Sequence, residues 1–173
     1  MARKAARILV DIWDDREFTA LRSIEQVVYF HILSSRDLSW CGVNPLLPQR
    51  MARLCSDITA RKAERSLDVL AERRFLVIDQ DTAEVAARTF VRHDDILASP
   101  NVSKAMCRAL ELVRSETIRA SVMSELARLY REDSAARGWV AIGAAFPELF
   151  AELSANPSAN PSANPSANPS RKG

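Results

Sequence analysis

Basic side chains gather in residues 50–74, the part of the chain best equipped to bind a partner. This stretch carries seven basic residues against four acidic ones, whereas the whole chain of 173 residues has a net charge of only +2. The seven are Arg50, Arg53, Arg61, Lys62, Arg65, Arg73 and Arg74. Lysine and arginine neutralise phosphates, and one arginine can donate two hydrogen bonds to a guanine base. The cluster therefore favours contact with a nucleic acid.

The spacing within this cluster suits one face of an α-helix. Arg61 and Arg65 are four residues apart and share a face, with Lys62 beside it. Thr59 precedes them and is a good N-cap residue. In a helix-turn-helix, the N-terminal residues of the second helix lie nearest the base edges, while the preceding helix meets phosphates. The predicted DNA contacts are Arg50, Arg53, Thr59, Arg61, Lys62, Arg65 and Arg88.

A solvated helix face is the alternative interpretation of the same residues. Glu64, Asp68 and Glu72 are interleaved with the basic residues and could pair with them. Residues 79–81, the tip of a predicted hairpin, are acidic at both ends and would be repelled by phosphate. That hairpin either points away from DNA or serves only in packing, although Arg88 on its second strand could approach the backbone. The turn before the helix and the hairpin after it favour DNA binding.

No other group of residues predicts catalysis or cofactor binding. The three cysteines, Cys41, Cys55 and Cys107, are far apart and form no CxxC pair, which argues against zinc and disulfides. Residues 93–95, His-Asp-Asp, are too close in sequence to surround one ion, and no phosphate-binding glycine loop occurs. No stretch approaches the roughly 20 apolar residues of a membrane helix. We expect a cytoplasmic protein that is not an enzyme and needs no metal or cofactor.

Hydrophobic periodicity and helix breakers predict the elements that position the basic cluster. A short strand is expected over residues 7–13 and a helix over residues 19–34, with Ser23 capping its main part. A loop follows to Pro48, which suits the first position of a two-turn helix. Residues 56–59 then form the turn before the helix that carries Arg61.

That helix is predicted to end near Arg74 and to be followed by a hairpin. Strands are expected over residues 75–79 and 84–91, with a turn between them. The order is strand, helix, helix, turn, helix, strand, strand. We therefore predict a mainly α fold with a small β-hairpin wing, namely a winged helix-turn-helix followed by C-terminal helices.

The C-terminal part is predicted to be helical and then repetitive. Helices are expected over residues 101–114, 116–131 and 138–150, the last broken by Gly143 and Pro147. Ser-Ala-Asn-Pro then repeats four times and predicts a disordered tail. The predicted domains are residues 1–100 for DNA binding, 101–153 as a helical extension, and 154–173 as the tail. The nearly neutral helical extension suits homodimerisation, which would present two DNA-binding units.

Several runs of residues resemble one family. Residues 8–21 contain an aspartate-rich turn of the form D-x-x-F-x-x-L, and residues 57–59, 70–77 and 89–97 continue the pattern. They resemble the N-terminal winged-helix domain of phage replisome organisers and DnaD-like proteins, as in helix-turn-helix proteins of actinobacterial phages and prophages. The resemblance covers residues 7–107 and implies a protein that binds double-stranded DNA at a replication origin, with other replication proteins as partners. Residues 108–150 do not show the C-terminal motif of DnaD.

Three functions remain open at this stage. The first is a phage-type replication initiator or organiser, and the second is a transcriptional regulator on the same fold. The third is a protein-interaction adaptor without DNA contacts. A shared fold does not decide between them.

Overall fold

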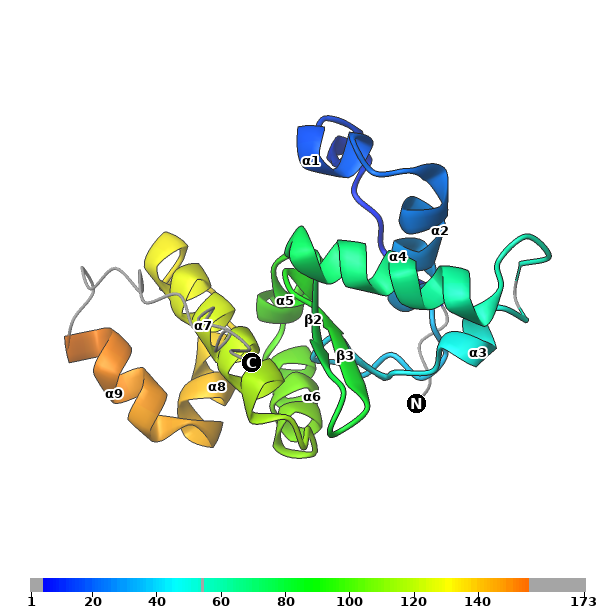
Figure 1. The fold of residues 1–173 in the computed structure, drawn as a ribbon. Coiled ribbons are helices and arrows are strands. Elements are labelled where there is room, and N and C mark those ends of the chain that lie inside the picture. Colours follow the sequence, from blue (N-terminus) through cyan, green and yellow to red (C-terminus); the bar gives the residue numbers. More distant parts are fainter. Residues whose placement is uncertain (1–4, 54, 156–173) are drawn as a thin grey trace, which may run out of the picture.

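The computed structural model describes residues 5–53 and 55–155. The Ser-Ala-Asn-Pro repeats lie outside the described residues apart from Ser154 and Ala155, which belong to the last helix. The predicted disorder of the tail therefore lies outside the described residues too. The described chain is mostly helical with one small antiparallel sheet, as the sequence predicts (Figure 1).

The N-terminal half holds all three strands of the described chain. Its elements are a 3-10 helix η1 (Val10–Trp13), α1 (Arg16–Thr19), α2 (Ser23–Leu33), β1 (Val43–Pro45), α3 (Pro48–Met51), α4 (Ala60–Glu72), β2 (Leu76–Asp79) and β3 (Glu84–Ala87). The strands pair in the order β1-β3-β2, with Val43 and Val77 on either side of Ala86. The strand β3 is thus the centre of the sheet, and all four of its residues are buried.

The C-terminal half is helical. Its elements are α5 (Phe90–His93), a 3-10 helix η2 (Ile96–Ala98), α6 (Pro100–Glu111), α7 (Glu116–Glu132), α8 (Trp139–Ala145) and α9 (Pro147–Ala155). Figure 1 shows the β2–β3 hairpin between α3 and α4 on one side and α5, α6 and α7 on the other. The buried apolar residues form one continuous cluster that runs from Phe18 to Ile142. One core therefore joins the two halves of the chain.

The strand predicted over residues 7–13 is wrong. The segment ends in η1, whose Asp14 N–H donates to the carbonyl of Asp11 at 2.9 Å. Asp15 then caps α1, because its Oδ1 accepts from the N–H groups of Glu17 and Phe18 at 2.8 and 3.3 Å. β-branched composition predicted the strand, but this capping favours helical turns, and the described sheet contains only β1, β3 and β2.

The third strand lies where the sequence predicts a loop. β1 contains Pro45 and follows Gly42, and both residue types normally interrupt regular structure. Since β1 pairs only with β3, it is an edge strand, where a proline is tolerated. Gly42 has a φ of +82°, and a Cβ there would lie 2.5 Å from the Cβ of Phe90. Only glycine fits this turn without displacing that ring.

Three other boundaries differ from the prediction. The helix predicted over residues 19–34 is shorter and corresponds to α2, residue 19 ends the separate helix α1, and Ser23 is the first residue of α2 rather than its cap. The second hairpin strand ends at Ala87, because the next residues turn into α5. Pro147 begins α9 as a first helical residue, whereas Gly143 lies inside α8, where its missing side chain leaves room for the ring of Phe150.

Candidate nucleic-acid interface

The helix α4 presents its basic residues because its other face is fully used in packing. Ala63, Ser66, Leu67 and Leu70 are buried beneath it. Their positions, three and four residues apart, place Arg61 and Arg65 on the opposite face. Both arginines are exposed, and so is Lys62 beside them. The predicted face of α4 therefore exists and points to solvent.

The predicted cap of this helix is confirmed. The hydroxyl of Thr59 accepts a hydrogen bond from the N–H of Lys62 at 3.2 Å. The ammonium of Lys62 turns back and donates to the carbonyl of Asp57 at 2.9 Å. Thr59 thus holds the first turn of α4 in place, and its side chain is engaged within the protein.

Charges on the outer face of α4 are segregated along its axis. Arg61 and Arg65 occupy the N-terminal half, and Asp68 and Glu72 occupy the C-terminal half. Neither Arg61 nor Arg65 forms an ion pair with any acidic residue that the structure describes, and this includes the neighbouring Glu64. The ion pairs that the solvated-face alternative allowed are therefore not formed by these two arginines with described residues, and both side chains stay exposed to solvent.

The helix dipole adds to the positive charge of this face. The N-terminus of an α-helix carries partial positive charge, so acidic side chains stabilise it and basic ones weaken it slightly. The first turn of α4 contains no acidic residue and carries Arg61 and Lys62 instead. An anion bound at this turn would interact favourably with the side chains and with the dipole together.

A groove beside α4 adds a basic residue that sequence reasoning missed. Lys62 and Arg65 line it together with Arg22, from the start of α2. Arg22 is 71% exposed, and its Nε donates to Oε1 of Glu25 at 2.7 Å. No local signal could assign it to this surface, since it lies about 40 residues before Lys62 in sequence.

The carboxylate of Glu25 fixes Arg22 at the edge of the groove. Oε2 of Glu25 accepts the backbone N–H of Arg22 at 2.6 Å, which starts α2. Burial alone would raise the pKa of Glu25, but hydrogen bonds from the side chain and backbone of Arg22 outweigh it and leave this pKa lowered. The same hydrogen bond raises the pKa of Arg22. The pair is thus held in its charged form.

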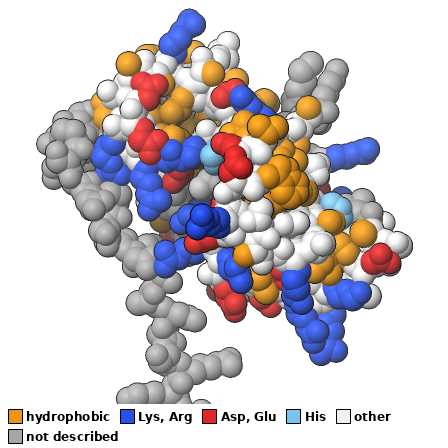
Figure 2. Space-filling model, turned by 90° about the horizontal axis from the view of Figure 1, so that it is seen from above, with side chains coloured by type: hydrophobic (Ala, Val, Ile, Leu, Met, Phe, Trp, Pro, Cys, Tyr) orange, Lys and Arg blue, Asp and Glu red, His pale blue; other side chains and the backbone are white. Residues whose placement is uncertain are grey.

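The predicted residues on and after α3 are exposed. Arg50 forms an ion pair with Asp37, so part of its charge is already neutralised. Arg53 follows α3 and forms no ion pair with another described residue. Figure 2 shows basic side chains in several groups on the face that it draws, interspersed with acidic ones. That face therefore carries separate points of positive charge rather than one continuous patch.

Arg88 lies at the opposite end of α4 from Arg61. Its backbone N–H donates to the carbonyl of Phe75, just after α4 ends, at 3.1 Å. With 13 residues, α4 is about 20 Å long. Arg88 is also partly buried, and its Nε is enclosed without a hydrogen-bond partner in the described structure. The structure therefore does not bring Arg88 together with the basic N-terminal half of α4.

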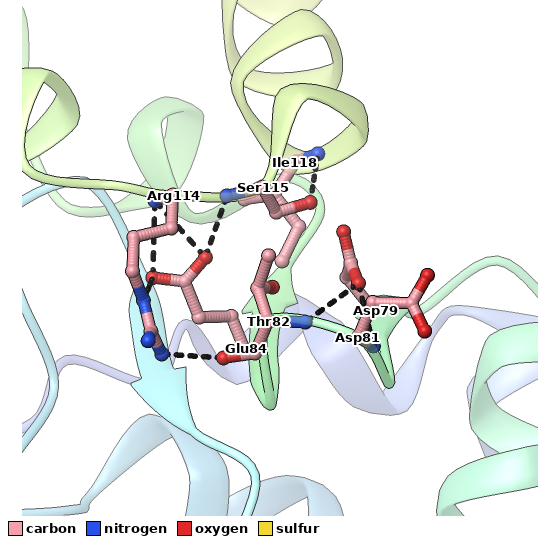
Figure 3. Close-up of polar contacts among 7 residues, drawn as sticks. All are labelled: Asp79, Asp81, Thr82, Glu84, Arg114, Ser115 and Ile118. Carbon is pink, nitrogen blue, oxygen red and sulfur yellow. Dashed lines mark hydrogen bonds and ion pairs between the residues drawn. The ribbon is translucent and has the colours of Figure 1, made fainter.

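The hairpin is attached to the C-terminal half instead of projecting freely (Figure 3). The carboxylate of Glu84 accepts the backbone N–H groups of Arg114 and Ser115, at 3.1 and 2.8 Å. A guanidinium N–H of Arg114 donates to the carbonyl of Thr82. Hydrogen bonds from Ser115 and from backbone N–H groups of the turn lower the pKa of Asp79. These contacts favour the packing role for the hairpin.

Other chemistries find little support in the described residues. No group of histidine, cysteine and acidic residues is arranged to hold a metal ion in that part of the chain. Cys107 is buried, and burial raises its pKa to about 11, so its thiol stays protonated at neutral pH. No helix among the described residues has the length and apolar character needed to cross a membrane.

Comparisons with protein-family models, with curated proteins and with solved structures find no match to this chain. The resemblance of residues 7–107 to replisome-organiser and DnaD-like domains therefore stays a prediction. The candidate interface rests on its own geometry, namely the exposed N-terminal half of α4 and the groove beside it.

Proposed function

We propose that this protein binds double-stranded DNA through the N-terminal half of α4. The observation that carries the proposal is the pair Arg61 and Arg65, exposed at the start of a capped helix and free of ion pairs with described residues. Arginines in this position can donate to the O6 and N7 atoms of guanine in the major groove.

The proposed arrangement is a winged helix-turn-helix in which α3 and α4 form the helix-turn-helix. The order α2, β1, α3, α4, β2, β3 and the central position of β3 support this proposal. In it, α4 enters the major groove, and Arg22 and Arg53 meet phosphates on either side. The hairpin makes no base contact, because Glu84 and Thr82 tie it to Arg114.

Filter binding of the full chain to genomic fragments tests this function. A duplex-binding protein retains a subset of fragments, and its affinity falls as salt rises because counterions are released from phosphates. Retention of no fragment at low salt would contradict DNA binding and favour the adaptor alternative.

The biological role that we favour is a phage-type replication initiator or organiser. Its support is the resemblance of residues 7–107, and the alternative is a transcriptional regulator on the same fold. Mapping the retained fragments separates the two roles, because an initiator binds at an origin and a regulator binds at promoters.

We also propose that the C-terminal helices mediate self-association. Val140 on α8 is 77% exposed, and it lines an apolar groove with Trp139, Pro147 and Phe150. Two copies would place two α4 helices on neighbouring half-sites. Light scattering of the full chain and of Val140→Asp tests this: a dimer that the substitution dissociates supports it, and a monomer at micromolar concentration contradicts it.

A further inference from the structure

A cavity of about 240 Å³ lies on the other side of α2 from the groove described above. The segment before α1, the middle of α2 and the start of α5 surround it. None of the proposed DNA contacts lines it. Its contents would therefore be independent of DNA binding.

Aromatic rings form the floor of this cavity. Phe18, Tyr29 and Phe75 contact one another, with centroid distances of 5.8, 6.0 and 5.7 Å for the three pairs. Phe90 adds a fourth ring, and Ile12 and Leu33 add aliphatic walls. An apolar cavity of about 150 Å³ can hold a benzene ring. The present cavity has room for one ring and a short substituent.

The lining of the cavity also carries acidic side chains. Asp11, Asp15 and Asp94 line it, against one guanidinium, that of Arg7. Arg7 is itself paired with Asp95, so part of its charge is already neutralised. Burial lowers the pKa of His93, the remaining basic group of the lining, and its imidazole is neutral at pH 7.

The carboxylate of Asp15 lies close to the aromatic floor. Its Oδ1 accepts the N–H groups that begin α1. Burial raises the pKa of Tyr29, and the negative charge of Asp15 raises it further. The charge of Asp15 therefore acts on the phenol of Tyr29, while the guanidinium of Arg88 acts on it in the opposite direction.

We propose that this cavity binds a small organic ammonium ion with an aromatic or branched apolar body. The apolar body would lie on the rings of Tyr29 and Phe75, where a cation is also attracted by the ring faces. The ammonium group would lie between Asp11 and Asp15. A neutral ligand would gain no charge interaction with these carboxylates, and an anion would be repelled by them.

Benzylamine and benzyl alcohol are matched probes for this site, since they share size and shape and differ in charge at pH 7. Isothermal titration of the full chain should give saturable binding of benzylamine at one site. The affinity should exceed that for benzyl alcohol at least about tenfold, because only the amine gains the charge interactions.

The double variant Asp11→Asn/Asp15→Asn tests the residues. Asparagine is also a good N-cap, so α1 should remain folded, as circular dichroism would verify. Benzylamine affinity should fall about tenfold while that for benzyl alcohol is unchanged. Asp14→Asn is the matched control, because Asp14 is exposed but does not line the cavity, and it should bind benzylamine like the natural chain.

A variant that fills the cavity, Ile12→Trp, should abolish binding of both probes. Equal affinity for the amine and the alcohol would overturn the inference of a cation site. An equal loss in Asp14→Asn would overturn the assignment of the residues. No saturable binding of either probe up to about 10 mM, beyond the weakest affinities of specific sites, would overturn the site itself.

Discussion

Oε2 of Glu84 accepts the backbone N–H of Ser115 at 2.8 Å, across 31 positions of sequence. Glu84 begins the central strand β3, and Ser115 is the N-cap of α7, with its own hydroxyl accepting the N–H of Ile118. One buried carboxylate therefore fastens the hairpin to the start of the longest described helix. This contact joins the two halves of the chain in addition to their shared core.

Replacing Glu84 should lower the stability of the whole chain. Glu84→Ala leaves the N–H groups of Arg114 and Ser115 without their acceptor, and unsatisfied buried groups cost about 1–3 kcal/mol. Glu84→Gln keeps an acceptor oxygen and should cost less. Urea unfolding of both variants measures the difference, and equal stability of Glu84→Ala and the natural chain would contradict the role of this contact.

The pair of Arg22 and Glu25 should make stability depend on acid pH. The pKa of Glu25 is lowered in the folded protein from its usual 4.5, so its contribution is complete above that value. The contribution is lost as the pH falls through the lower, folded value. The free energy of unfolding of the natural chain should therefore exceed that of Glu25→Gln at pH 7, and the gap should shrink below about pH 4. A gap that stays constant with pH would contradict the ion pair.

Two glycines offer a matched test of packing. Gly42→Ala should destabilise the fold by about 2–4 kcal/mol, from the strained positive φ and the overlap with Phe90 together. Gly143→Ala should cost much less, because a Cβ there would lie 3.2 Å from the ring of Phe150 within a regular helix. Thermal unfolding compares the two, and a similar cost for both would show that the turn at Gly42 can relax.

Local sequence signals predicted where the helices of the candidate site begin, although α3 is the single turn Pro48–Met51 and not the predicted two-turn helix. Thr59 caps α4, and Pro48 begins α3, because both act on the backbone next to them. The apolar spacing of Leu67 and Leu70 likewise predicted which face of α4 is buried.

Local sequence patterns could not predict the contacts between segments that are distant in sequence. β1 is a strand because β3 lies beside it, whereas residues 7–13 pair with no described strand and end in η1. Arg22 reaches the groove of Lys62 through the packing of α2 on α4. The attachment of the hairpin to Arg114 was equally invisible, since it depends on how α6 and α7 fold back.

Fluorescence anisotropy of labelled duplex DNA tests the central proposal most directly, with Arg61→Ala/Arg65→Ala compared with Arg119→Ala. Arg119 is exposed on α7 and forms no ion pair with another described residue, so it controls for loss of positive charge. On a selected fragment, the double variant should bind at least about tenfold more weakly, since a specific arginine contact contributes about 1–3 kcal/mol. Arg119→Ala should bind like the natural chain. Natural affinity in a folded Arg61→Ala/Arg65→Ala variant would contradict the assignment of α4 as the DNA-binding helix.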